Sequence, residues 1–403
     1  MINLVIFNGG RGACTLIPSI LENKNIKLSS VVNAYDDGKS TGAIRNYFNM
    51  LGPSDIRKVQ QLMLPVDDPD FENNFWLFDF RFPKKGSNSS FLEELTNEVN
   101  SKSSTLFKKK FQNKILVKHI KTYLDLFLKN LSLIQKSSNL PQFSFKDCSL
   151  MNCIYAGAYI LHERNIQDAA LHIEKLFNLK GSVLPNSLEN KKLMGIRENG
   201  EFLYNEAEIV ELRSNISVER VFLLDDYLNK KYFCNLSKKE KLRYLLSHQS
   251  YVAATSRVIR AINDADIIVY SPGTQHSSLY PTYLSKGVPE AIANNTKSKK
   301  IFISNIGADY ETPKYDAHDY ILGAYKYLNL SDPRLYEIKD FFTDMLVNLP
   351  ATKKKKNYVQ VNTKKLKSIP VKMHISDYES SDQSGKHSGH KLFDLIQKIY
   401  NFN

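Results

Sequence analysis

The sequence predicts an α/β protein with a Rossmann-like, doubly wound and mainly parallel sheet. Two stretches of the chain carry this prediction. Near the N-terminus the apolar segment Ile2 to Phe7 is followed by a glycine turn, an apolar pattern at helical spacing over 13–21 and a second strand over 29–34. In the last third, an apolar strand over 265–270 again leads into a loop and a helix. Strands that alternate with helices are typical of parallel sheets.

The glycine turn NGGRG, residues 8–12, interrupts the chain directly after the first strand. Glycines let the backbone turn sharply and approach a ligand closely, and the free N–H groups at a helix start favour an anion. The three glycines do not complete the G-x-G-x-x-G pattern of dinucleotide-binding proteins. Taken alone, the turn is equally compatible with a structural connection between strand and helix.

Two adjacent carboxylates, Asp36 and Asp37, follow the second strand. Ligands of open α/β sheets bind at the carboxyl ends of the strands, and carboxylate oxygens are the ligands that Mg²⁺ prefers. With Gly38, the same pair is also typical of a solvated turn. The glycine turn and the carboxylates together favour a binding site more strongly than either motif does alone.

A second loop, SPGT at residues 271–274, follows the strand over 265–270. Its hydroxyl and N–H groups suit a phosphate oxygen, although serine and threonine are also ordinary at a helix start. His276 is more typical of a hydrogen-bonding surface residue than of a catalytic acid or base. We expect the three loops, at 8–12, 36–38 and 271–274, to meet around one polyanionic small molecule.

The remaining segments suggest one large domain with an insertion and a tail. Residues 1–350 are predicted to form the α/β domain, with a helical insertion or lid over 66–147, a small β-hairpin at 199–200 and a final strand over 344–347. In the insertion, Trp76, Phe78 and Phe80 are compatible with an acceptor pocket and, more commonly for aromatic clusters, with core packing. Residues 351–403 are predicted to form a lysine-rich, partly disordered tail.

The charge of the chain is concentrated in that tail. The formal net charge is +13, and it falls to +5 without the eight lysines of 351–372, a segment that contains no acid. A nucleic-acid partner is therefore not favoured, because such proteins distribute basic residues over a docking surface. The lysine run is typical of a solvated segment, although an anionic partner or membrane surface would also attract it.

Other features of the composition favour a cytoplasmic protein. No apolar run approaches the about 18 residues of a membrane span, and the N-terminus lacks the pattern of a signal peptide. The four cysteines show neither zinc-binding nor redox spacing. A homo-oligomer is compatible with the sequence.

Five segments, in this order, carry a resemblance to a known family: NGGRG, YDDGKSTGAIR, LGPSDIRK, VLPNSLE and YSPGTQHSSLYPTYL. Together they resemble the 2-phospho-L-lactate transferase (CofD-like) superfamily, which includes the gluconeogenesis-factor (YvcK-like) nucleotide-sugar-binding proteins. The resemblance spans about residues 1 to 350. It implies a nucleoside-diphosphate-linked small molecule as the partner.

Two functions follow from this resemblance. The first is a transferase that moves a phosphate-linked group, of the phospholactate type, from a nucleoside-diphosphate-activated donor to a hydroxyl acceptor. The alternative is a non-catalytic regulator that binds a UDP-sugar. In the transferase, Asp36 and Asp37 would bind Mg²⁺, and one of them would act as the base.

The resemblance also implies which residues contact the nucleotide or its phosphates. Arg45 and Arg57 would clamp phosphate oxygens, although an arginine on a helix is as often a surface residue. The full set is Gly9, Gly10, Gly12, Thr15, Lys39, Ser40, Arg45, Arg57, Asn152, Ser271, Gly273 and Thr274. Lys39 stands where the family has glycine, and Arg11 where it has threonine. Both add positive charge that either strengthens anion binding or replaces part of the role of a metal, so retention of Mg²⁺ stays open.

Overall fold

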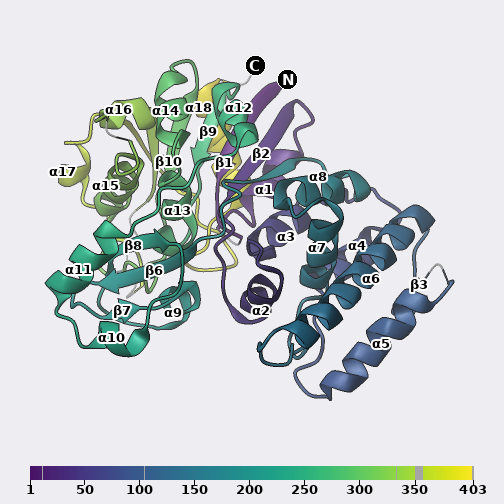
Figure 1. Ribbon diagram of the computed structural model, residues 1–403. Coiled ribbons are helices and arrows are strands. Elements are labelled where there is room, and N and C mark those ends of the chain that lie inside the picture. Colours follow the sequence, from purple (N-terminus) through teal and green to yellow (C-terminus); the bar gives the residue numbers. More distant parts are fainter. Residues whose placement is uncertain (11, 104, 333, 350–356, 402–403) are drawn as a thin grey trace. The chain divides into compact units, whose positions relative to one another are not determined.

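The computed structural model describes residues 1–401 except 11, 104, 333 and 350–356. The chain divides into two compact units (Figure 1). Unit 1 consists of Met1–Tyr35 and Leu184–Asn403, and unit 2 consists of Asp36–Val183. The chain thus leaves unit 1 directly before Asp36.

The core of unit 1 is a seven-stranded sheet in the order β12-β11-β10-β9-β1-β2-β5. Every pairing from β12 to β2 is parallel. The strands are β1 Ile2–Phe7, β2 Ile26–Val32, β5 Ser182–Pro185, β9 Ile267–Tyr270, β10 Lys299–Ile303, β11 Asp344–Asn348 and β12 Lys372–Ser376.

The centre of this sheet confirms the predicted fold class. Strand β1 lies between β2 and β9, with Leu4 opposite Leu28 on one side and Ile267 on the other. Residues 4–7 of β1 and all of β9 are buried, which is why their sequences are continuously apolar rather than alternating. Since all three run parallel, their carboxyl ends bring the loops that follow β1 and β9 to the same edge of the sheet.

Unit 1 also contains a three-stranded antiparallel sheet with its own apolar cluster, which includes Met194, Phe222 and Phe233. Its strands are β6 Lys192–Arg197, β7 Phe202–Leu203 and β8 Val218–Leu224. The predicted hairpin at 199–200 is confirmed: the N–H group of Arg197 donates to the carbonyl of Glu201, and Gly200 takes the positive φ of +87° that the turn requires.

Helices flank both sheets of unit 1 (Figure 1). They are α1 Leu16–Leu21, α9 Glu206–Glu211, α10 Lys230–Cys234, α11 Lys238–Ser247, α12 Ser256–Asn263, the π-helix η1 Gln275–Leu279, α13 Tyr280–Tyr283, α14 Val288–Asn294, α15 Ala317–Leu328, α16 Ile338–Phe341, α17 Thr363–Leu366 and α18 Gly389–Tyr400.

Unit 2 is mainly helical and begins and ends well outside the expected insertion of 66–147. A close approach of two helices lies at its centre, where a Cβ on Gly157 of α7 would lie 1.8 Å from the carbonyl oxygen of Tyr123 in α6. The elements are α2 Lys39–Phe48, α3 Ser54–Gln61, α4 Phe71–Asp79, α5 Asn88–Asn100, β3 Thr105–Leu106, β4 Lys109–Lys110, α6 Lys114–Ser137, α7 Leu150–Leu161 and α8 Ile166–Leu176.

The aromatic residues of α4 pack against other rings of unit 2. Phe78 is fully buried and meets Phe177 edge-on, with 4.9 Å between ring centroids. Trp76 and Phe80, both half-buried, lie 5.0 Å apart. These contacts agree with the core interpretation of the cluster.

The C-terminal part of the chain differs from the expected tail. Residues 357–401 contribute β12 to the main sheet, so the strand over 344–347 is not the final one. Helix α18 packs so closely on α1 that a Cβ on Gly389 would lie 1.9 Å from the carbonyl oxygen of Thr15. The sequence hides this arrangement because β12 is a half-exposed edge strand with little apolar character. The lysines of 353–356 lie outside the described residues.

None of the helices in the described part of the chain is both long and apolar enough to cross a membrane.

Candidate functional site

Two of the three predicted loops meet in unit 1. A Cβ on Gly12 would lie 2.2 Å from the carbonyl oxygen of Pro272 and 3.2 Å from Cα of Gly273, and one on Gly9 would lie 2.6 Å from Cβ of Ser278. Only glycine permits this approach. Within the described residues, the N–H groups of Gly9, Gly10 and Gly12 donate no main-chain or side-chain hydrogen bond. We call this arrangement of residues 9–13 and 271–278 the loop cluster.

The second loop of the loop cluster is held by acceptors within the protein. The buried carboxylate of Glu311 accepts hydrogen bonds from the N–H groups of His276 (2.8 Å) and Ser277 (3.1 Å) and from Oγ of Ser277 (2.5 Å). The N–H group of Gly273 donates to Oδ1 of Asn305 at 2.8 Å. These N–H groups, unlike those of the glycine turn, are therefore already used.

The hydroxyl groups of this loop also bond within it. Oγ of Ser271 donates to the carbonyl of Pro272 at 3.2 Å. Thr274 and Ser278 share a hydrogen bond of 2.8 Å between their hydroxyl groups. A ligand phosphate at Ser271 or Thr274, as predicted, would have to compete with these contacts.

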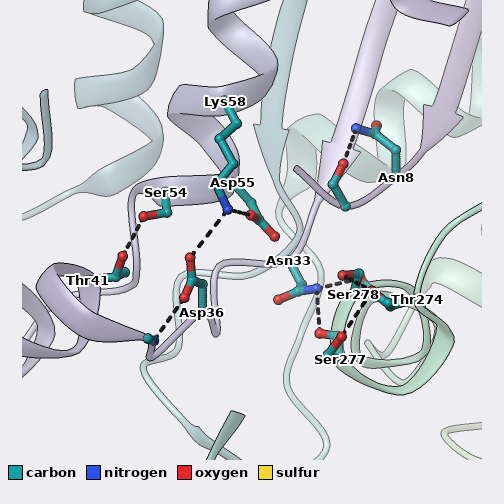
Figure 2. A network of polar contacts seen from close by, with 12 residues as sticks. Asn8, Asn33, Asp36, Thr41, Ser54, Asp55, Lys58, Thr274, Ser277 and Ser278 are labelled. Carbon is teal, nitrogen blue, oxygen red and sulfur yellow. Dashed lines mark hydrogen bonds and ion pairs between the residues drawn. The ribbon is translucent and has the colours of Figure 1, made fainter. Parts of the chain in front are cut away.

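Asn33, at the end of β2, fixes the loop cluster from a third strand (Figure 2). Its side-chain amide donates to the carbonyls of Ser277 (3.2 Å) and Ser278, and its Oδ1 accepts from the N–H group of Tyr35 at 3.0 Å. Asn8 accepts a hydrogen bond from Ser30 on β2. Buried amides thus tie the strand ends together.

His276, within the loop cluster, and Thr15, just after its first loop, differ from their predicted surroundings. His276 is fully buried rather than on the surface, and neither ring nitrogen hydrogen-bonds within the described residues. Burial lowers its pKa to about 3, so the ring is neutral. Thr15, predicted to hold diphosphate, donates its hydroxyl to the carbonyl of His387 at 3.2 Å and thus binds the C-terminal segment.

In unit 2, a second group of polar residues surrounds Asp36 (Figure 2). Oδ1 of Asp36 accepts the N–H group of Gly38 at 3.0 Å, and Oδ2 lies 3.7 Å from the ammonium nitrogen of Lys58. Lys58 also donates to Asp55 at 2.9 Å. We call Asp36, Asp37, Arg45, Asp55 and Lys58 the carboxylate cluster.

Asp37 forms an ion pair with Arg45, whereas Asp36 pairs with Lys58. Nη1 of Arg45 lies 3.8 Å from Oδ1 of Asp37, and the Arg45 side chain is completely buried. A Cβ on Gly42 would lie 2.5 Å from the carbonyl oxygen of Asp37, so glycine at this position lets helix α2 approach the carboxylate cluster. Arg45 is therefore a partner of Asp37 rather than a surface residue.

Hydroxyl and amide groups adjoin the carboxylate cluster. Nδ2 of Asn152 lies within 3.4 Å of the hydroxyl oxygens of Ser40, Thr41 and Ser54. Thr41 and Ser54 also hydrogen-bond to each other (Figure 2). The predicted binding residues Ser40 and Asn152 are thus brought together, on α2 and α7.

The other two predicted basic residues lie in different environments. Arg57 is buried and donates to the carbonyl of Phe78 at 2.5 Å; burial lowers its pKa. Lys39 is 64% exposed and lies 3.8 Å from Asp147. Its backbone has a positive φ of +44°, a conformation that favours the glycine of the family pattern.

In the carboxylate cluster, the acidic and basic side chains shift one another's pKa values in opposite directions. Burial, and next the charge of Asp55, raises the pKa of Asp36, while Lys58 opposes the shift. Burial lowers the pKa of Lys58, but the charges of Asp55 and Asp36 outweigh it and raise this pKa above its ordinary value. Because each carboxylate already faces a basic side chain, the arrangement does not suit a divalent cation. Mg²⁺ at Asp36 and Asp37 stays a prediction.

Sequence reasoning missed the residues that act through long-range contacts. Asp55 and Lys58 lie inside the segment LGPSDIRK, and Asn33 lies in the predicted strand over 29–34, so their neighbourhood was a usable signal. Glu311 lies in no motif, and only the folded chain reveals that it holds residues 276 and 277.

Comparisons with known proteins agree with this architecture. The family model described as 2-phospho-L-lactate transferase CofD matches residues 4–384. The chain is 22% identical to a putative gluconeogenesis factor of Thermotoga maritima, with 98% of each chain covered. It is 24% identical to a gluconeogenesis factor of Halalkalibacterium halodurans, with 98% of this chain and 95% of the relative covered.

A crystal structure of a protein from Bacillus halodurans has the same fold. It superimposes with a TM-score of 0.67 at 22% sequence identity and covers 98% of this chain and 99% of that one. From the family match over residues 4–384, together with the sheet and loops described above, we conclude that the chain belongs to the 2-phospho-L-lactate transferase CofD family.

Proposed function

We propose that this protein binds a nucleoside-diphosphate-linked small molecule, such as a nucleotide sugar, and acts as a regulator rather than as an enzyme. The observation that carries the proposal is the glycine turn of the loop cluster. Its N–H groups at Gly9, Gly10 and Gly12 lack acceptors among the described residues, at the carboxyl edge of a parallel sheet. Main-chain N–H groups in such a turn suit diphosphate oxygens.

Two further observations favour regulation over turnover. Asp36 and Asp37, the residues predicted to act as metal ligands and base, are paired with Lys58 and Arg45. A metal ion at either carboxylate would have to displace this cationic partner. The curated relatives that match nearly the whole chain are named gluconeogenesis factors.

The second candidate is transfer of a phospholactate-type group to a hydroxyl acceptor, and the family match supports it. In that case Asp36 and Asp37 would hold Mg²⁺ or remove the acceptor proton. Attack on phosphorus needs charge neutralisation and in-line positioning.

Calorimetric titration with UDP- and GDP-linked sugars tests the proposed binding. We expect Gly12→Ala to weaken binding at least about tenfold, because its methyl group would collide with Pro272 and separate the two loops. Gly195→Ala in β6 is the matched control, since its Cβ would make only ordinary contacts of 3.4 Å. Equal affinities of the two variants, or no binding by the unmodified protein, would contradict the proposal.

Asp37→Asn separates the regulator from the enzyme. A regulator binds the nucleotide without releasing product, and the variant leaves its affinity unchanged. An enzyme releases nucleoside monophosphate from an activated donor in the presence of a hydroxyl acceptor, which phosphorus NMR detects, and loses this activity with Asp37→Asn.

The compartment forms part of the proposal. All four cysteines are free thiols, and Sγ of Cys148 lies 3.7 Å from Sγ of Cys153 without a bond. Unpaired neighbouring thiols are typical of a reducing compartment, which supports the cytoplasm.

A further inference from the structure

Lys58 holds an unusual position among the carboxylates of unit 2. Its ammonium nitrogen lies 2.9 Å from Oδ1 of Asp55 and 3.7 Å from Oδ2 of Asp36. The side chains of both acids are largely shielded from solvent, with exposed fractions of 12% and 17%. One ammonium group thus faces two carboxylates and offsets part of their mutual repulsion.

The charges around this group are balanced. Among the described residues of the carboxylate cluster, Asp36, Asp37 and Asp55 are matched by Lys58, Arg45 and the neighbouring Arg57, which interacts electrostatically with Asp36 and Asp55. A divalent cation is bound by oxygen ligands with an excess of negative charge. Adding Mg²⁺ here would place it within a few ångströms of an ammonium group.

The carboxylates of Asp36 and Asp55 nevertheless lie on either side of one position that a cation could occupy. The N–H group of Gly38 orients Asp36, and Asp55 lies in the first turn of α3, three residues before Lys58. We infer that the ammonium group of Lys58 occupies the place between Asp36 and Asp55 that a divalent cation would take. While Lys58 is present, the carboxylate cluster therefore holds no Mg²⁺. The inference concerns the carboxylate cluster alone and does not depend on the proposed function.

The inference predicts that removing Lys58 creates a metal site. Binding of Mn²⁺, used as a probe for Mg²⁺, is measured by electron paramagnetic resonance on the full chain without nucleotide. We expect the unmodified protein to show no saturable binding that depends on Asp36, and Lys58→Ala to gain one saturable site, which Mg²⁺ displaces. Lys58→Ala combined with Asp36→Asn loses this site, because one of its two carboxylates is gone.

Two control variants test whether Mn²⁺ binding depends on the loss of the positive charge at Lys58. Lys58→Arg retains the positive charge and binds no Mn²⁺. Lys180→Ala removes a lysine whose ammonium group pairs with Asp67, at 2.6 Å in the same unit, and gains no site. Should Lys58→Ala fail to fold, as judged by circular dichroism, Lys58→Gln replaces it, because its amide keeps a hydrogen-bond donor near Asp55.

Two outcomes would overturn the inference. One is saturable Mn²⁺ binding to the unmodified protein that Asp36→Asn abolishes. The other is a folded Lys58 variant without charge that binds no Mn²⁺. Failure of the protein to bind any nucleotide sugar would instead contradict the proposed function and leave the Mn²⁺ result standing. Where nucleotide does bind, we expect its affinity to be the same with Mg²⁺ and with a chelator.

Discussion

Lys39 has an exposed side chain and an unfavourable backbone conformation. Its φ of +44° lies in the left-handed region, which costs a non-glycine residue about 1 kcal/mol. Its ion pair with Asp147, at 3.8 Å and with a largely exposed ammonium group, contributes little. We therefore expect Lys39→Gly to raise the free energy of unfolding by up to about 1 kcal/mol.

Urea unfolding followed by tryptophan fluorescence measures this change, because Trp76, the single tryptophan, belongs to unit 2. Lys39→Ala removes the charge but keeps the strained backbone, so it should bring no gain. Lys118→Gly, at an exposed position inside α6 with ordinary helical geometry, should lower the free energy by about 1 kcal/mol. A loss of stability in Lys39→Gly equal to that of Lys118→Gly would contradict the argument.

Single residues of the site were predictable where local chemistry sufficed. The glycines at 9 and 12 follow from a strand that must turn, and Asp36 and Asp37 from carboxylates at a strand end. The pairing of Asp37 with Arg45, and of Asp36 with Lys58, was not predictable, because ion pairs depend on how helices α2 and α3 pack. Sequence reasoning therefore located the carboxylates but not their charge balance.

At the scale of elements, helices α6, α7 and α8 meet around three histidines. The ring of His172 lies 5.2 Å from that of His119 and 4.9 Å from that of His162, centroid to centroid. The hydroxyl of Tyr123 hydrogen-bonds to Nδ1 of His172. Burial lowers the pKa of His172, as do the charges of His162, His119 and Lys175; burial also lowers the pKa of His162, against the charge of Asp168.

These shifts predict that unit 2 is sensitive to acid. Because the folded pKa lies below the unfolded value of 6.5, the unfolded chain binds more protons as the pH falls below that value. We expect the free energy of unfolding, measured by Trp76 fluorescence in urea, to decrease from pH 7 to pH 5. His172→Phe should show a smaller decrease, since one titrating ring is lost. An identical pH profile for this variant and the unmodified protein would rule out His172 as a cause.

The helices and strands that are most deeply buried were the easiest to predict from the sequence. Strands β1, from residue 4 onward, and β9 are buried and read as apolar runs with clear ends. Strand β12 lies at the sheet edge, and its five residues, all exposed or half-buried, lack such a run. Helix α18 has an apolar face but follows a polar segment, so residues 351–403 were expected to form a partly disordered tail.

At the scale of the whole molecule, the division into units depends on contacts that no local pattern encodes. The chain enters unit 2 at Asp36, inside a motif, and leaves it within β5. The expected boundaries of 66 and 147 followed a change in composition instead. Composition therefore revealed that an additional helical part exists, but not that α2, α3, α7 and α8 belong to it.

The C-terminal segment is integrated into unit 1 through Tyr378. The side chain is fully buried; its hydroxyl donates to the carbonyls of Ser304 (2.9 Å) and Leu346 (3.3 Å), and its N–H group donates to Asn348. Removing a large buried ring costs about 3–5 kcal/mol. We expect Tyr378→Ala to lower the free energy of unfolding of unit 1 by about this amount.

Far-UV circular dichroism during urea unfolding measures the effect, because it follows the sheet as well as the helices. Tyr378→Phe keeps the ring and should lose only about 1 kcal/mol, since it gives up the hydrogen bonds of the hydroxyl alone. Tyr232→Ala, whose side chain is 58% exposed, should change the free energy by less than about 0.5 kcal/mol. If Tyr378→Ala were as mild as Tyr232→Ala, the segment from 372 onward would be a dispensable tail rather than the edge of the sheet that carries the loop cluster.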